Sequence, residues 1–210
     1  MSHGFDTTED CTAHAEAIRS VGFRFVGRYY FDIVSHAKTK LTRSEAEALS
    51  AAGLFVVAVF ENGPDHPGYF SRAKGVSDGT AAFRYAADHI EQPQNSPIYF
   101  AVDYDASAAD LSGVIADYFD GIAEAFAAEK GDAAAYPIGV YGSGLACTRL
   151  LASGAATFAW LAQSTGWAGF ATFTHWNLKQ GPSKTRVGLP VDLDESQGKG
   201  GGFQISLVDV

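Results

Sequence analysis

The 210-residue sequence has little cysteine, no surplus of basic residues and no apolar run longer than a strand. Its two cysteines, Cys11 and Cys147, lie outside any CxxC or Cys/His spacing, so a structural metal site is not expected. Isolated cysteines of this kind usually behave as small buried hydrophobic residues in a reduced protein. We therefore expect free thiols, no metal and no cofactor.

Basic charge is scarce, because 15 Lys and Arg stand against 24 Asp and Glu, for a formal net charge of −9. Nucleic acid and anionic membranes both require a basic face, so neither is expected as a partner. No apolar run could span a bilayer, and the first residues show no signal-peptide pattern. As written, the sequence predicts a soluble, cytoplasmic chain without membrane insertion. A signal already removed, or release by a phage-type route, would place it at the cell wall instead.

Length and composition predict one main globular domain. Apolar residues make up 47% and charged residues 19%, an ordinary balance that excludes a disordered chain. We place a barrel domain at residues 1–196 and a Gly-rich hinge with a C-terminal tail at 197–210. The sequence leaves open whether that tail docks, pairs with a strand edge or stands apart.

Continuous apolar runs of strand length, each ending in polar or glycine residues, predict buried parallel strands. Three weaker candidates join five strong ones, and helical patterns separate the strong runs. This alternation predicts a parallel sheet with right-handed crossovers. The strong strands are 23–30, 54–61, 98–103, 138–142 and 157–163, and the weaker ones are 4–6, 171–177 and 189–193.

A closed barrel fits this pattern better than an open sheet. A doubly wound sheet would carry a glycine-rich phosphate loop after its first strand, and Asp6-Thr7-Thr8-Glu9 stands there instead. We therefore expect an α/β fold, a (β/α)8-type TIM barrel whose last helices are short or missing. Barrel strands would gather their polar ends on one rim, where active sites lie. The residues expected there are Asp6, Arg28, Glu61, Asp103, Tyr141, Gln163, Trp176 and Asp192.

The strongest chemical signal is Asp103-Tyr104-Asp105, at the end of a very hydrophobic strand. Residues two apart on a strand face the same way, about 7 Å apart, so both carboxylates could line one cavity. Paired buried carboxylates raise each other's pKa, which keeps one protonated near neutral pH. Glycosidases need such a pair, one acid to protonate the leaving oxygen and one carboxylate to stabilise or attack. Asp105 is equally suited to cap the following helix beside Ser107.

Other rim residues complete this candidate site. Asp6 and Asp192 are expected as further acids, with a helix cap and a surface turn as their structural alternatives. Arg28 is expected to pair with one of the acids, because an unpaired arginine there would be costly. Glu61 is either another acid or the partner of Arg28. Polar and aromatic side chains at strand ends suit the faces of sugar rings, or equally cap a core. Those expected to bind substrate are Tyr141, Gln163 and Trp176.

Five motifs taken in order resemble the glycoside-hydrolase-like family filed as domain of unknown function 1906. The likeness runs from residue 4 to about 194. That family is similar to the glycoside hydrolase family 25 muramidases, which cleave the β-1,4 bond between N-acetylmuramic acid and N-acetylglucosamine. The resemblance implies an irregular (β/α) barrel with an acidic groove. The motifs are 4–7 (GFDT), 26–29 (VGRY), 98–105 (IYFAVDYD), 139–143 (GVYGS) and 160–164 (WLAQS).

The resemblance also implies roles for the acids. Muramidases have an Asp after strand one, an Asp-x-Glu after strand four and an Asp near the last strand, where Asp6, Asp103 and Asp192 match. Asp105 replaces their acid glutamate. It is one methylene shorter, so its proton would fall about 1–1.5 Å short, at a cost of about 100-fold in rate. The substrate then sits deeper, or Glu61 or another acid takes the role, or the barrel binds without cutting.

Together these patterns predict a lysozyme-like glycoside hydrolase acting on peptidoglycan or a related N-acetylated glycan. Asp105 is expected as the general acid. Asp103 would orient the N-acetyl group or stabilise positive charge, while Asp6 and Asp192 shape an acidic floor that Arg28 holds in register. The alternative is a catalytically inactive glycan-binding barrel of the cell envelope.

Overall fold

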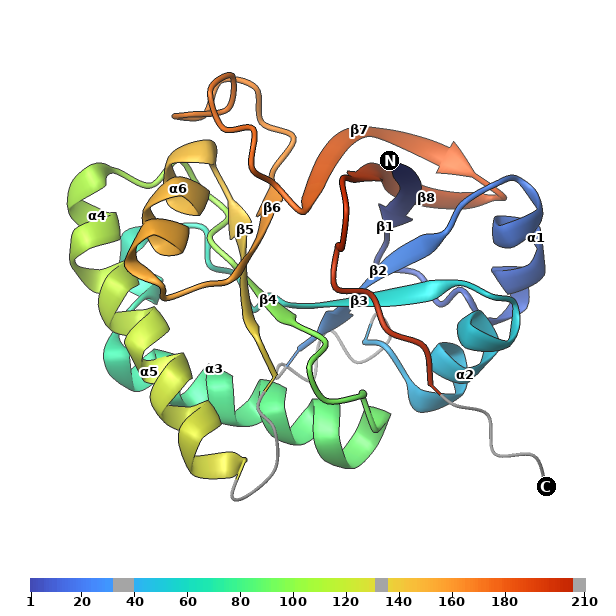
Figure 1. Ribbon diagram of the computed structural model, residues 1–210, viewed down its shortest axis with the longest axis horizontal. Helices are drawn as coiled ribbons and strands as arrows, with labels where there is room; N and C mark the ends of the chain where they lie inside the picture. The colour runs from blue at the N-terminus through green and yellow to red at the C-terminus, as the bar shows by residue number, and fades with distance from the viewer. Residues whose placement is uncertain (32–39, 131–135, 206–210) are drawn as a thin grey trace.

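The computed structural model describes residues 1–31, 40–130 and 136–205. Within these ranges, eight strands close into a barrel in chain order (Figure 1). Neighbouring strands from β1 to β7 are parallel, whereas β8 is antiparallel to both β7 and β1. The predicted barrel is confirmed. The strands are β1 (Ser2–Asp6), β2 (Phe25–Tyr30), β3 (Phe55–Phe60), β4 (Ile98–Ala101), β5 (Ile138–Gly142), β6 (Phe158–Leu161), β7 (Leu178–Arg186) and β8 (Leu189–Ser196).

Helices cover the outside of the barrel unevenly. Figure 1 shows α1 and α2 beside β1 to β3, and α3 to α6 beside β4 to β6. Residues 162–177 contain no helix, and β7 and β8 form a hairpin, so the last helices are missing as expected. The helices are η1 (Thr12–His14), α1 (Ala15–Ser20), α2 (Arg43–Ala51), η3 (Pro67–Tyr69), α3 (Arg72–Arg84), η4 (Tyr85–Ile90), α4 (Ala108–Ser112), α5 (Val114–Glu129) and α6 (Gly144–Ser153).

The seventh strand lies later in the chain than the sequence predicts. Residues 171–177 form turns and irregular structure, and β7 begins at Leu178. Its outer half is exposed and polar, since it forms a hairpin with β8 that no helix covers. Such a strand lacks the continuous apolar run that marks a buried parallel strand. The aromatic residues of 170–176 therefore suggested a strand where the chain forms a loop.

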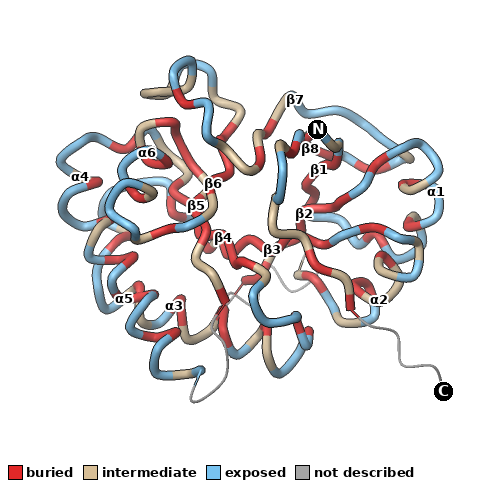
Figure 2. The backbone as a smooth tube through the Cα atoms, viewed as in Figure 1, coloured by how far each residue is buried: buried red, intermediate tan, exposed pale blue. Residues whose placement is uncertain are grey.

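Side chains alternate between two apolar layers. Inward-facing residues of the barrel form one cluster, which includes Phe25, Val57 and Trp160. Outward-facing residues such as Val26 and Val56 pack with the helices in a second, larger cluster. Figure 2 shows buried residues along most of the barrel strands, whereas buried and exposed residues alternate along the outer helices. Burial on both faces explains why these strands read as continuous apolar runs.

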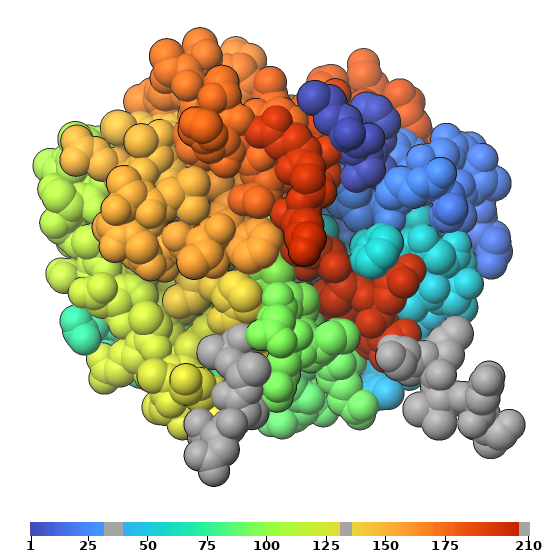
Figure 3. Space-filling view, viewed as in Figure 1, coloured from blue at the N-terminus to red at the C-terminus, as the bar shows by residue number. Residues whose placement is uncertain are grey.

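The last described residues close the amino end of the barrel. Backbone N–H groups of Val56 and Phe203 each donate to the other's carbonyl at 2.8 Å. Tyr99 donates its hydroxyl to the Gly200 carbonyl at 2.9 Å. Gly201 has a φ of +78°, and a Cβ there would lie 2.1 Å from Pro97, so glycine is required. The segment 198–205 therefore packs on the barrel, and Figure 3 shows it in red, beside the dark-blue N-terminus.

Both cysteines are free and buried, Cys11 just before η1 and Cys147 in α6. Cys147 lies close enough to the Gly142 carbonyl for a weak S–H contact of 3.8 Å.

Across residues 1–31, 40–130 and 136–205, no helix has the length and apolar character needed to cross a bilayer.

Candidate active site at the carboxyl rim

The carboxyl ends of the strands bring several acids together inside the barrel. Asp6 is the last residue of β1, Glu61 directly follows β3, and Asp103 lies two residues beyond β4. Gly27 on β2 makes room for the first of them. A Cβ at Gly27 would lie 2.7 Å from the Asp6 Cβ and 2.8 Å from the Trp160 ring. Only glycine therefore lets these two side chains turn inward side by side.

Asp6 is buried and held by two hydrogen bonds. Tyr29 donates its hydroxyl to Oδ1 at 2.6 Å, and Gln180 donates Nε2–H to Oδ2 at 2.8 Å. Tyr141 in turn donates to the Gln180 Oε1 at 2.8 Å. Burial raises the pKa of Asp6 to about 6, and the nearby charge of Asp192 adds to it, while the two hydrogen bonds act in the opposite direction. Asp6 is therefore mostly ionised at neutral pH.

Asp194 forms a carboxyl pair with Asp6. Trp160 donates its indole N–H to Asp194 Oδ1 at 2.8 Å, but Oδ2 finds no donor among the described residues. Burial and the negative charge of Asp6 raise the pKa of Asp194 well above its usual range. A proton on Asp194 removes the repulsion between the two carboxylates, and it also removes the cost of a charged Oδ2 that has no donor. Asp194 is therefore the protonated member of the pair, and Asp6 the one that ionises first.

Glu61 and Asp103 are both half-buried, but their surroundings differ. Burial raises the pKa of Glu61 to about 8, and the negative charges of Asp103 and Asp6 act in the same direction. None of the described residues donates a hydrogen bond to its carboxylate. Burial also raises the pKa of Asp103, helped by the charge of Asp65. The Asp103 backbone N–H is fixed by the Pro64 carbonyl at 2.9 Å.

Asp105 does not share the position of Asp103. Its side chain is exposed, and Oδ1 accepts the Ala168 N–H at 2.8 Å, which links it to the β6–β7 connection. The expected two-residue alternation fails because β4 ends at Ala101, before either acid. Asp105 is not the helix cap either, since Ser107 and Asp110 form a capping box at the start of α4.

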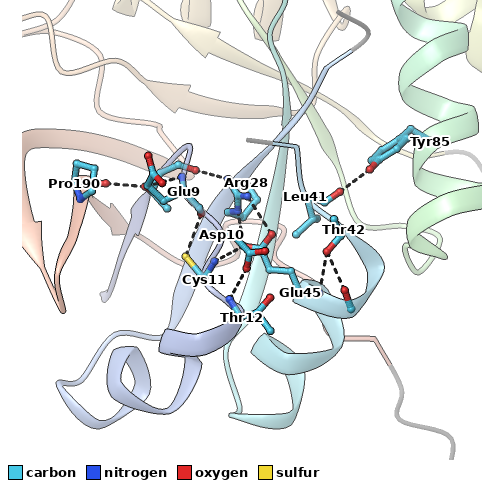
Figure 4. A network of polar contacts seen from close by, with 12 residues as sticks. Glu9, Asp10, Cys11, Thr12, Arg28, Leu41, Thr42, Glu45, Tyr85 and Pro190 are labelled. Atoms are coloured by element: carbon cyan, nitrogen blue, oxygen red, sulfur yellow. Dashed lines mark hydrogen bonds and ion pairs between the residues drawn. The ribbon is translucent and has the colours of Figure 1, made fainter. Parts of the chain in front are cut away.

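Arg28 does not contact the rim acids but lies in a separate polar network with Glu45 and the chain around Cys11 (Figure 4). It is fully buried and pairs with Glu45, with Nε to Oε1 at 2.6 Å and Nη2 to Oε2 at 3.0 Å. Its third contact is Nη1–H to the Thr7 carbonyl at 2.6 Å, and Glu45 also accepts the Cys11 N–H at 2.9 Å. The expectation that Arg28 pairs with a rim acid is therefore wrong. Because Tyr29 faces Asp6 inside the barrel, its neighbour Arg28 must face outward. There it anchors the chain that follows Asp6.

Of the other residues predicted at the rim, Asp192 and Gln163 lie near Asp6, and Trp176 does not end a strand. Asp192 lies opposite Asp6 in the β1–β8 register and accepts a short hydrogen bond from Ser183. Gln163 is half-buried and donates its backbone N–H to Gln180 Oε1 at 3.4 Å, so it lies beside the Asp6 network. Trp176 precedes β7 and therefore does not end a strand at the rim, contrary to expectation.

Two residues of this site escaped sequence reasoning. Gln180 was missed because the seventh strand was placed before it. The sequence favours Asp192 and does not indicate Asp194. Residues two apart on β8 face the same way, and both of these acids influence the pKa of Asp6. The Val191-Asp192-Leu193-Asp194 alternation was the available signal.

An eight-stranded barrel with acids gathered inside its carboxyl rim is the arrangement expected of a glycoside-hydrolase-like protein. Within that class, the chain belongs to the Rv2525c-like, glycoside hydrolase-like domain family, which matches residues 16–198. The predicted resemblance is thereby confirmed.

Two relatives from Bacillus subtilis (strain 168) are uncharacterized proteins. FadG is 32% identical over 164 residues, covering 77% of this chain and 28% of FadG. YbfG is 33% identical over 175 residues, covering 78% of this chain and 23% of YbfG. The chain thus spans about a quarter of the length of these relatives.

Solved structures share the fold at low sequence identity. The Mycobacterium tuberculosis Tat-secreted protein Rv2525c, in complex with L-tartrate, aligns with a TM-score of 0.77 and 21% identity, covering 96% of this chain and 98% of that one. A muramidase from Acremonium alcalophilum gives 0.57 and 16%, with 95% of each chain covered. A family 25 glycosyl hydrolase from Bacillus anthracis gives 0.53 and 11%, covering 95% and 90%. The likeness includes muramidases and shows their barrel fold here.

Proposed function

We propose that this protein is an O-glycosyl hydrolase of the lysozyme type, acting on peptidoglycan or a related N-acetylated glycan. The observation that carries the proposal is the set of rim acids with unequal proton affinities. Asp6 ionises near pH 6, whereas the pKa of Glu61 is raised to about 8. Acids whose environments separate their pKa values in this way supply both a proton donor and a negative charge.

Glycosidic cleavage passes through a transition state in which the sugar ring carries positive charge. Asp103 and the ionised Asp6 supply the opposing charge, and Asp192 adds to the same acidic surface. The half-buried rings of Tyr29 and Tyr141 lie among these acids, where an apolar face of a sugar can pack against them. Substrate binding and charge stabilisation would then share one rim.

Among the structural relatives, one is a muramidase, one a family 25 glycosyl hydrolase and one a Tat-secreted protein. These relatives support a glycan of the cell wall as substrate and action outside the cytoplasm.

The decisive test is lysis of purified bacterial cell walls, followed by release of reducing ends. We compare wild type with Asp103→Asn, Asp6→Asn and the control Asp117→Asn, whose carboxylate is exposed on α5. The two rim variants are expected to lose about 100-fold or more in turnover, and the control to stay within about twofold. Affinity for soluble glycan fragments should stay within a few-fold for the Asp103 variant, because neither ring is altered.

One observation favours a second candidate, a catalytically inactive glycan-binding barrel. Asp105, in the position of the muramidase acid, is exposed and has one oxygen engaged by Ala168. Glycan binding by wild type without any release of reducing ends would establish this alternative and exclude the hydrolase.

A further inference from the structure

Building on the proposed function, we infer that Glu61, rather than Asp105, is the general acid that protonates the leaving glycosidic oxygen. Glu61 directly follows β3, and the β3–β4 register pairs Phe60 with Phe100. Continued by one residue, this register brings Glu61 level with Ala101, two residues before Asp103.

Glu61 lies between two other carboxylates. The negative charges that act on it are those of Asp103, beyond β4, and Asp6, at the end of β1. The phenols of Tyr29 on β2 and Tyr141 on β5 in turn feel the charge of Glu61. Its backbone N–H donates to the Tyr30 carbonyl at 3.4 Å, which fixes the start of the side chain. Glu61 thus lies within electrostatic range of rim residues from four other strands.

The neighbours of Glu61 explain why it keeps a proton. Asp6 has two hydrogen-bond donors that stabilise its charge, whereas none of the described residues donates to Glu61. A carboxyl that is half-buried, flanked by like charges and without donors relieves its cost only by staying protonated. Burial and these charges raise the pKa of Glu61 to about 8, so the proton is present at neutral pH.

Asp105 lacks these properties. It is exposed, and its Oδ1 accepts the Ala168 N–H, so one oxygen is already committed to the backbone. Its side chain is also one methylene shorter than that of Glu61. A proton donor must come within about 2.6–3.2 Å of the oxygen that it protonates, which favours the longer side chain on the inner side of the rim.

Cleavage uses one proton from Glu61, which water later restores. The Glu61 carboxyl gives its proton to the glycosidic oxygen as the C–O bond breaks, and the leaving sugar departs as an alcohol. The electron pair of that bond stays with the oxygen, and the positive charge on the ring faces Asp103 and Asp6. Water then supplies the new oxygen at the anomeric carbon, and its proton restores the carboxyl of Glu61. One water is consumed for each bond cleaved.

The test uses two substrates that differ in leaving group. Cell-wall glycan needs a proton on the departing sugar, whereas a 4-nitrophenyl glycoside of an N-acetylated disaccharide has a leaving group that needs none. Glu61→Gln is expected to lose about 100-fold or more on cell walls and to stay within about tenfold on the nitrophenyl substrate. Asp105→Asn tests the competing acid and should stay within about threefold on both, and the control is Asp117→Asn, exposed on α5. Glu61→Asp keeps the acid but shortens it, so intermediate cell-wall turnover is expected.

Three results would overturn the role of Glu61 alone, and a fourth would overturn the proposed function as well. Cell-wall turnover by Glu61→Gln within tenfold of wild type overturns the inference. An equal loss on both substrates, in a variant that melts like wild type or higher, overturns it too, since proton donation would not explain the loss. A substrate-dependent loss in Asp105→Asn instead assigns the acid to Asp105. Wild type that cleaves neither substrate overturns the proposed function itself and, with it, the role of Glu61.

Discussion

Replacement of Glu61 by Gln tests the electrostatics of the rim without any substrate. Gln is close to Glu in shape, so the change removes a titrating group and leaves the packing nearly as it was. Burial and two neighbouring charges raise the pKa of Glu61 from its ordinary 4.5 to about 8 in the folded chain. Between these two values, the folded chain holds a proton that the unfolded chain has released.

The sign and size of the effect follow from proton linkage. A raised carboxyl pKa contributes stability at low pH that is lost as pH rises from 4.5 toward 8, because the unfolded state releases its proton first. At pH 7 the loss covers about 2.5 pH units, or about 3.4 kcal/mol at most. Glu61 is only half-buried, so screening by water reduces this to about 1–3 kcal/mol. Glu61→Gln avoids the loss and should be more stable than wild type by that amount.

Thermal melts between pH 4 and 8.5 measure the difference. For a chain of this size, 1 kcal/mol corresponds to about 2–4 °C in Tm. Wild type and Glu61→Gln should melt together near pH 4 and separate as pH rises, with the variant higher. Glu9→Gln, an exposed glutamate, is the control and should follow wild type at every pH. A variant that is less stable at pH 7, or a difference that does not grow with pH, would refute the reasoning.

Three further outcomes follow from the same contacts. Cell-wall turnover should be bell-shaped in pH and centred near neutrality, rising as Asp6 ionises near pH 6 and falling as Glu61 loses its proton near pH 8, as a turnover series from pH 4 to 10 will show. Gly27→Ala places a methyl 2.7 Å from the Asp6 Cβ and should cost about 1–3 kcal/mol in denaturant unfolding, together with most of the turnover. Arg28→Met leaves Glu45 buried and unpaired and should cost about 3–5 kcal/mol, of which Arg28→Met combined with Glu45→Leu recovers the larger part.

The barrel and three of its acids could be predicted because buried parallel strands leave a plain pattern. Each strand is an apolar run, and the first polar residue after it stands at the rim. Asp6 ends its strand, and Glu61 and Asp103 follow theirs by one and two residues. The rule needs only the end of a run, so small errors in strand boundaries do not disturb it.

The antiparallel part of the barrel could not be predicted with the same rule. β7 forms a hairpin with β8 and is polar along its outer half, so it has no apolar run. Gln180, which connects Asp6 to Tyr141, therefore had no visible strand to place it. Trp176 was assigned to a strand end for the opposite reason, since aromatic residues of a packed loop look like a strand.

The alternation of side chains along a strand explains the remaining differences between the predicted and the observed site. On β2, Tyr29 and Arg28 are neighbours and must face opposite sides, so only one of them could reach the acids. The buried carboxylate of Glu45 made the outward position possible for Arg28. That partner lies 17 residues away on α2, and nothing in the local sequence indicates the pairing.

Parity also governs where a proton donor can stand. Two residues apart on a continuous strand share a face, and Asp192 and Asp194 on β8 both act on Asp6. Beyond the end of β4 the ladder no longer fixes the backbone, so Asp105 turned outward while Asp103 stayed at the rim. The β3–β4 register brings Glu61 level with Ala101, and the charge of Asp103 acts on Glu61, so an acid after β3 lies within electrostatic range of one after β4. A chain that lacks the acid glutamate after its fourth strand therefore does not lack a position from which to donate the proton, and Glu61 occupies one.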